Sequence, residues 1–200
     1  MAGTHPPNMA IMAILQVIVA STRPGRIGLP IATWFARAAA EHGGFDVELV
    51  DLADYNLPLF DEPSHPRLRQ YTKEHTRRWS ETIERGDAYV VVHPEYNYSF
   101  NAAIKNAFDF LHQEWADKPV SFVSYGGVSA GTRATQALKQ VVTTLRMVPT
   151  FEQVPIPFAP QFLNEEGDFV PNELVAAGVG PVVNELARLN GALSSLRKSR

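Results

Sequence analysis

The chain has 200 residues, which fit one ordinary domain with a core large enough to need no disulfide or structural metal. It contains no cysteine, and this excludes disulfides, thiolate metal sites and every cysteine-nucleophile mechanism. A net charge of -3 and a pI near 6.1 argue against general nucleic-acid binding, which normally shows as a basic face.

The first predicted element is a buried strand at residues 14–20, at the end of the apolar run from Met9 to Ala20. That run is shorter than the roughly 20 residues that a membrane span requires, and no Lys or Arg precedes it as in a signal peptide. We therefore expect no membrane partner and a flexible tail over residues 1–12. Because the lack of cysteine fits a reducing compartment, we also expect a cytoplasmic location.

Runs typical of strands then alternate with helical patterns, as in a parallel sheet with helices on both faces. Residues 28–42 repeat apolar side chains at three- and four-residue steps, which predicts a helix that ends at two glycines. A second strand is predicted at 45–51, with Phe45, Val47 and Leu49 facing inward. The stretch 54–66 contains three prolines and predicts a long surface loop.

The same alternation continues to the end of the chain. A polar helix is predicted at 67–85, a strand buried on both faces at 88–93, and a helix at 99–113 with Ser99 as its cap. A fourth strand at 119–124 is followed by a helix at 129–147 that Ser129 caps. A short fifth strand at 150–156 precedes a closing helix at 171–196, with Pro171 in its first turn.

Five strand-helix units favour an α/β fold, a flavodoxin-like doubly wound five-stranded parallel sheet of order 2-1-3-4-5, in one domain over residues 1–200. In such sheets, ligands bind beyond the carboxyl ends of the strands, where the strand order reverses. The loops after the first, third and fourth strands are therefore the places where a site is expected.

The first of these loops, residues 21–28, has the parts of a phosphate cradle. Ser21 and Thr22 carry hydroxyls, two glycines allow close backbone approach, and the following helix presents unpaired N–H groups. Arg23 and Arg26 can add charge-assisted hydrogen bonds. Because no Lys-Ser/Thr follows a glycine and no G-x-G-x-x-G is present, the loop indicates a terminal monophosphate. The alternative is an ordinary turn with surface arginines.

The second loop, residues 94–99, follows the most apolar strand. Pro94 ends the strand, and Tyr96 and Tyr98 place two aromatic rings beside Asn97. Ring faces together with amide and backbone donors suit a planar heterocycle. The alternative is a plain strand-to-helix turn with tyrosines on the surface.

The third loop, residues 124–133, is rich in glycine and lets the backbone approach a flat ligand. It contains a G-x-S-x-G pattern around Ser129, but the hydrolases with that pattern need a histidine after the serine, and all six histidines precede it. It also imitates a phosphate-binding P-loop, but Thr132-Arg133 stands where Lys-Ser/Thr is required. Both readings fail.

Metal binding has little support, because the histidines are scattered and no H-E-x-x-H is present. His93, at the end of the third strand, is either a packed strand-end residue or a wall of the pocket. It lacks the partners expected of a general base. No catalytic side chain and no metal ligand are therefore predicted.

Together these motifs resemble the NADPH-dependent FMN reductase family, a flavodoxin-like group that includes quinone, azo-dye and chromate reductases. The likeness covers roughly residues 14 to 155. It is carried by four segments in the right order: Ala20-Ser21-Thr22-Arg23-Pro24-Gly25-Arg26, Pro94-Glu95-Tyr96-Asn97 with Ser99, Lys105-Asn106-Ala107-Phe108-Asp109-Phe110, and Tyr125-Gly126-Gly127 with Gly131 and Arg133.

The resemblance implies an FMN site at the three loops. Its phosphate contacts would be Ser21, Arg23, Arg26, Ile27 and Gly28, and its ring contacts Pro94, Glu95, Tyr96, Asn97, Ser124, Tyr125, Gly126 and Gly127. Lys105 and Asp109 would brace the site. The resemblance also implies a homodimer or tetramer, in which the 54–66 loop covers a neighbouring subunit's flavin. Two positions depart from the family: His93 replaces a threonine or small apolar residue, and Arg26 is shared by only part of the group.

The function that the resemblance implies is an NAD(P)H-dependent oxidoreductase. FMN would accept a hydride from NADPH or NADH and pass electrons to a small acceptor such as a quinone. Two other readings stay open. One is a flavodoxin-type electron carrier without nicotinamide turnover, although such carriers are usually much more acidic. The other is a flavin-free domain that binds a phosphate ligand.

Overall fold

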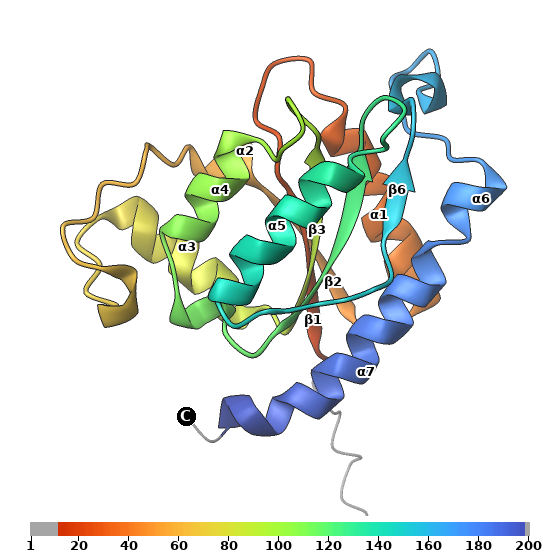
Figure 1. Ribbon diagram of the computed structural model, residues 1–200. Helices are drawn as coiled ribbons and strands as arrows, with labels where there is room; N and C mark the ends of the chain where they lie inside the picture. Colours follow the sequence, from red (N-terminus) through yellow and green to blue (C-terminus); the bar gives the residue numbers. More distant parts are fainter. Residues whose placement is uncertain (1–11, 199–200) are drawn as a thin grey trace, which may run out of the picture.

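A computed structural model describes residues 12–198 of the chain. The tail predicted for residues 1–12 therefore lies, apart from Met12, outside the described residues. Parallel strands form one sheet in the order β2-β1-β3-β4-β5, with β6 also paired to β4, so the predicted order 2-1-3-4-5 is confirmed (Figure 1). The strands are β1 Ile14–Val19, β2 Asp46–Asp51, β3 Ala88–Pro94, β4 Pro119–Tyr125, β5 Val148–Pro149 and β6 Val154–Ile156.

Two apolar clusters hold helices against the two faces of this sheet. One face carries α1 (Gly28–His42) and α7 (Val179–Lys198), around Phe35 and Val182. The other carries α3 (Glu74–Arg85), α4 (Ala102–Asp109) and α5 (Thr132–Thr144), around Trp79, Phe108 and Phe122. Because β3 and β4 lie between both clusters, all of their residues are buried, which the continuous apolar run predicts for β3. Among residues 12–198, no helix is long and apolar enough to cross a membrane.

The predicted start of the helix at 67–85 was wrong. Helix α3 begins at Glu74 instead of residue 67, after a short 3-10 turn at Pro66–Leu68. The buried carboxylate of Glu62 accepts hydrogen bonds from the backbone N–H groups of Thr72 and Lys73, and it thereby holds the chain just before the helix. The predicted 54–66 loop begins two residues later, because α2 (Leu52–Tyr55) occupies its first residues, and apart from the 3-10 turn the irregular segment continues to residue 73.

Both serine caps were also wrong. Helix α4 spans Ala102–Asp109 instead of 99–113, because Ser99 is held in a tight turn by backbone hydrogen bonds in both directions with Tyr96. A 3-10 turn, Gln113–Trp115, follows it. Helix α5 begins after Gly131, and the Ser129 hydroxyl donates to Glu95 instead of capping the helix.

Three further predictions needed correction near the sheet edges. The single strand predicted at 150–156 is replaced by two short strands, β5 before it and β6 at its end. The chain between β5 and β6 leaves the sheet, because the Thr150 and Ser121 hydroxyls both donate to the carbonyl of Glu152. The closing helix is two helices, α6 (Glu173–Ala176) and α7, and Asn172 caps the first, so Pro171 stays outside it. In β2, Leu49 is exposed and does not face the core.

Candidate functional site

The three predicted loops meet at the carboxyl edge of the sheet, at the upper end of the strands in Figure 1, around a cavity of about 490 Å³. A fourth segment, which sequence reasoning missed, completes it after β6. The lining residues are Ile27, Pro94, Glu95, Tyr96, Tyr125, Gly126, Gly127, Phe158, Ala159, Pro160 and Gln161. The fourth segment could have been suspected, because the carboxyl end of the fifth strand must lie at the same edge.

The first loop presents hydroxyl and N–H groups where it enters α1. Ser21 is buried, and its Oγ accepts a hydrogen bond of 3.1 Å from the Tyr125 hydroxyl. Burial raises the pKa of Tyr125 to about 12, so this phenol remains a donor at neutral pH. At Gly28, a Cβ would lie 2.4 Å from Ser21 Oγ and 2.5 Å from the Tyr125 hydroxyl oxygen, so a larger residue there would displace these two hydroxyls. No side chain caps α1, which leaves its first N–H groups available to an anion.

The two arginines of this loop have different surroundings. Arg26 pairs with Asp51 at the end of β2, through bonds of 2.6 and 2.5 Å, and also donates to the Ser21 carbonyl. Arg26 therefore ties the first loop to the end of β2. Arg23 is exposed, and its Nε donates to the Tyr96 hydroxyl at 3.2 Å, which links the first loop to the second. Its guanidinium has no carboxylate partner among the described residues.

The second loop turns sharply at two left-handed residues, Asn97 (φ 49°) and Tyr98 (φ 69°). Its start is fixed by a hydrogen bond from the Glu95 N–H to the Tyr125 carbonyl. Tyr96 stands half-exposed on the cavity wall, whereas Asn97 is exposed outside the lining. The backbone N–H groups of Asn97 and Gly127 have no acceptor within residues 12–198, so they remain free to bind a ligand edge.

The carboxylate of Glu95, on the cavity wall, is paired with Arg133. This carboxylate accepts from the Ser129 hydroxyl at 2.9 Å and from Arg133 Nε at 2.6 Å, and the Arg133 guanidinium lies 3.7 Å from the Tyr98 ring centre. Burial alone would raise the pKa of Glu95, but the bonds from Arg133 and Ser129 lower it below its ordinary value. The wall is therefore an ion pair that joins the second loop to the third.

The third loop is attached to the fourth segment by backbone hydrogen bonds. The Gly126 N–H donates to the Ile156 carbonyl, and the Phe158 N–H donates to the Gly127 carbonyl at 3.2 Å. Ser124, a predicted ring contact, is buried below the cavity and donates to the Ala130 carbonyl. Its role here is to hold the loop in place.

His93 is a packed strand-end residue, so the first of its two readings is confirmed. It is fully buried, its ring nitrogens lie 3.1 Å from Thr135 Oγ1 and 3.1 Å from the Pro94 carbonyl, and it does not line the cavity. Burial lowers its pKa to about 4, which keeps the ring neutral near pH 7.

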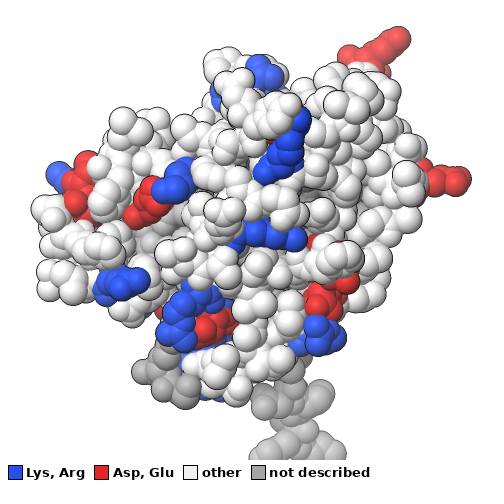
Figure 2. All heavy atoms as spheres, in the orientation of Figure 1, with Lys and Arg blue, Asp and Glu red and all other residues white. Residues whose placement is uncertain are grey.

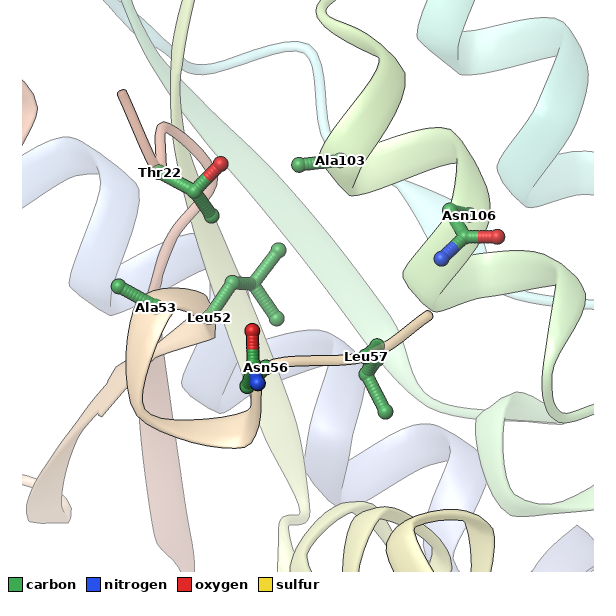
Figure 3. A pocket seen from close by; sticks show the side chains of 7 residues that line it. All are labelled: Thr22, Leu52, Ala53, Asn56, Leu57, Ala103 and Asn106. Atoms are coloured by element: carbon green, nitrogen blue, oxygen red, sulfur yellow. The ribbon is translucent and has the colours of Figure 1, made fainter. Parts of the chain in front are cut away.

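A second hollow of about 240 Å³ lies on the other side of the first loop (Figure 3). Thr22 borders it from the loop, Asn56 from the end of α2, and Asn106 from α4. Asn106 donates to the Pro58 carbonyl at 2.6 Å and accepts from the Phe60 N–H at 3.0 Å. It therefore fixes the segment after α2 against α4. Lys105 and Asp109 form an ion pair of 2.6 Å on the same helix.

Charges of both signs are mixed on the face shown in Figure 2, where Lys and Arg lie beside Asp and Glu without an extended basic area. Within the described part of the chain, no three His, Asp or Glu side chains gather where they could hold a metal ion. The cavity is therefore mostly apolar, and it adjoins the uncapped start of α1 at Ile27.

The strand order, with a loop-lined cavity at the carboxyl edge of the sheet, defines a flavodoxin-like α/β protein. The same fold is found in FerB, a flavoenzyme NAD(P)H:(acceptor) oxidoreductase from Paracoccus denitrificans, with a TM-score of 0.72 and 21% identity over 90% of this chain and 98% of that one. The chain belongs to the NADPH-dependent FMN reductase family, because the sequence model of that family matches residues 12–161. It is an NAD(P)H-dependent oxidoreductase.

Curated relatives are similar over most of their length. An NAD(P)H-dependent FMN reductase of Schizosaccharomyces pombe is 41% identical over 147 residues, which are 72% of this chain and 73% of the relative. One from Nectria sp is 37% identical over 74% of this chain and 77% of its own. A quinone reductase of Pseudomonas putida is 29% identical over 66% and 71%.

Proposed function

We propose that the protein holds FMN as a resident cofactor at the three loops, reduces it with NADPH or NADH, and passes the electrons to a small acceptor such as a quinone. The observation that carries this proposal is the apolar cavity at the carboxyl edge, which adjoins the uncapped start of α1 at Ile27. When bound, FMN would supply the hydride chemistry, because its ring accepts two electrons from a nicotinamide.

The residues present fit such a group. Ser21, Ile27, Gly28 and the uncapped start of α1 would receive the phosphate, and Arg23, which lies at the rim, would add a cation to it. Arg26 would act through its pair with Asp51, by keeping the loop in the receiving shape. The hydroxyl of Tyr125 supports Ser21 from below.

The ring would lie against the second and third loops. Pro94, Glu95, Tyr96, Tyr125, Gly126 and Gly127 line the cavity, and Ser124 and Asn97 shape the loops around it. The unpaired N–H groups of Asn97 and Gly127 are the donors that could stabilise negative charge on a ring edge after reduction. No side chain needs to act as nucleophile or general base.

The absorbance spectrum of the purified protein, followed by anaerobic titration with NADPH and NADH, tests this function. A band at about 450 nm that bleaches with nicotinamide and returns with a quinone is expected. A yellow protein that no nicotinamide bleaches would indicate an electron carrier. A protein that stays colourless after incubation with excess FMN would exclude a flavin function altogether.

Removing both loop arginines is expected to weaken FMN binding while leaving the sheet folded. Charge-assisted hydrogen bonds contribute about 1.5–3 kcal/mol when shielded, and Arg23 is exposed, so the double variant Arg23→Ala, Arg26→Ala should raise the dissociation constant of FMN by at least about tenfold. Quenching of FMN fluorescence measures that constant, and circular dichroism checks the fold. Arg37→Ala, an exposed arginine on the outer side of α1, is the matched control. Unchanged FMN affinity in the double variant would refute the phosphate assignment.

A homodimer or tetramer is proposed, in which the segment 54–66 covers a neighbouring subunit's site. Leu59 is 83% exposed at the tip of that segment, which Asn106 holds in place. Sedimentation should give at least twice the chain mass of 22.1 kDa, and Leu59→Asp should shift it toward the monomer. Leu174→Asp, at an equally exposed leucine on α6, should not. A wild-type protein that sediments as a 22.1 kDa monomer would contradict the proposal.

A cytoplasmic location is also proposed, on the ground that a chain without cysteine suits a reducing compartment. Cell fractionation with an antibody against the chain tests it, and recovery of the protein in a secreted fraction would contradict it.

A further inference from the structure

Phe158 has an unusual backbone for its residue type. It is in the left-handed region, with φ 47° and ψ 43°, and it precedes the 3-10 turn Ala159–Phe162. A bulky residue rarely adopts positive φ, because its Cβ meets the neighbouring carbonyl group. Glycine or asparagine would satisfy this turn at lower cost. The structure therefore keeps a phenylalanine where local geometry disfavours one.

The side chain of Phe158 gains no compensating burial. It is 53% exposed, and it stands on the rim of the site cavity. Its backbone is held on both sides, by the bond from its N–H to the Gly127 carbonyl and by the bond from the Gln161 N–H to its own carbonyl at 3.0 Å. Backbone strain of this kind, when fixed by neighbouring bonds, is typical of functional positions.

The cavity beside Phe158 is suited to a flat, uncharged ring. Ile27, Tyr96 and Pro160 contribute apolar or aromatic surface to it. Glu95 is the one charged residue among the described residues of the lining, and Arg133 neutralises it. Among the described residues, the lining itself contains no lysine or arginine, and Arg23, which is bonded to Tyr96 at the rim, is assigned to the FMN phosphate in the proposed function.

We propose that Phe158 forms the outer wall of the acceptor subsite, and that it selects planar, neutral acceptors of the quinone class over anionic ones. This inference rests on the proposed function, since the acceptor must meet bound FMN in the same cavity. The aromatic face would contact the acceptor ring, as aromatic side chains do in offset stacks. In the overall reaction, NAD(P)H supplies a hydride and the solvent one proton, so that the quinone leaves as the hydroquinone.

The experiment compares two acceptors in the FMN-loaded enzyme. Menadione is a flat, neutral quinone, and ferricyanide is an anion that needs no stacking surface. Phe158→Ala should lower kcat/KM for menadione about tenfold, the lower end of the range for losing one apolar contact, and should leave the ferricyanide rate unchanged. Phe158→Tyr should stay within about twofold of wild type, because it keeps the ring. Phe151→Ala removes a phenylalanine that is 88% exposed between β5 and β6, outside the cavity, and should change neither rate.

Two measurements that do not depend on turnover complete the test. Calorimetric titration of the oxidised enzyme with menadione, without nicotinamide, should show weaker binding in Phe158→Ala than in wild type. Phe158→Asn should unfold at a temperature about 2 °C higher than wild type, because asparagine tolerates the left-handed backbone. It should bind menadione as weakly as Phe158→Ala does, because it also lacks the aromatic ring.

Equal menadione binding and kinetics in wild type and Phe158→Ala would overturn the proposal, and so would an equal loss with both acceptors. Either result would leave the proposed function intact, provided that the wild-type protein is yellow and oxidises NAD(P)H. A wild-type protein that binds no FMN would instead contradict the proposed function itself.

Discussion

Replacing Gly131 with alanine is expected to lower the free energy of unfolding by about 3 kcal/mol, through two separate effects. Gly131 adopts φ 79° at the start of α5, where a residue with a Cβ is strained. The added Cβ would also lie 2.8 Å from Ser124 Cβ and 2.9 Å from the Tyr125 backbone nitrogen. Because the backbone of a buried strand cannot move aside cheaply, the third loop must shift.

Urea denaturation of the purified variant measures this loss. Gly191→Ala provides the control, because the position lies within α7 and a Cβ there meets no atom within 4 Å. That variant should be as stable as wild type, or more stable by up to about 1 kcal/mol, since alanine favours a helix. A Gly131→Ala protein with wild-type stability would show that the third loop is looser than its contacts indicate.

The second large effect is a loss of stability on acidification, caused by His93. Its pKa is about 4 in the folded protein, because burial disfavours the charged ring, and near 6.5 when unfolded. The unfolded chain therefore takes up a proton more readily between these values. Stability from this residue is present in full above pH 6.5 and declines as pH falls toward 4. Each pH unit corresponds to about 1.4 kcal/mol, so about 2 kcal/mol should disappear between pH 7 and pH 5.

Unfolding at pH 7 and pH 5, in wild type and in His93→Gln, isolates this contribution. The difference in stability between the two pH values should be about 2 kcal/mol smaller in the variant. His42→Gln, which removes a histidine that bonds to Asn184 on the surface, is the control. The lower limit of pH 5 also separates His93 from Glu62. Burial would raise the pKa of Glu62, but bonds from Thr72 and Lys73 lower it to about 2, so its contribution is lost only below about pH 4.5. Equal pH dependence in wild type and His93→Gln would contradict the argument.

Much of the architecture could be predicted because it depends on local periodicity. The continuous apolar run at residues 88–93 identifies a strand buried on both faces, and the 28–42 repeat gives the bounds of α1 without error. Once the strand order is known, the loops after three strands must share one edge. For this reason the sequence could indicate that Ser21, Tyr96 and Gly126 belong to one region.

What could not be predicted depends on contacts between distant residues. The pairing of Arg26 with Asp51 joins positions 25 residues apart, and nothing in the first loop distinguishes it from a free cation such as Arg23. Likewise, Ser129 and Ser99 both look like helix caps in the local sequence. In the structure the Ser129 hydroxyl donates to Glu95, and Ser99 exchanges backbone hydrogen bonds with Tyr96. The parallel order places the segment after the last strand at the same edge, but nothing in its proline-rich sequence singles out Phe158 as the residue that reaches the cavity.

The ion pair between Glu95 and Arg133 has a consequence for electron transfer. An isolated carboxylate on the cavity wall would repel the negative charge that a flavin ring gains when it is reduced. Arg133 is bound to Glu95 without any ligand, so in the proposed FMN site that repulsion would already be cancelled, and the wall would face both oxidation states without rearranging. A site built in this way can serve donor and acceptor in alternation with the same rigid surface.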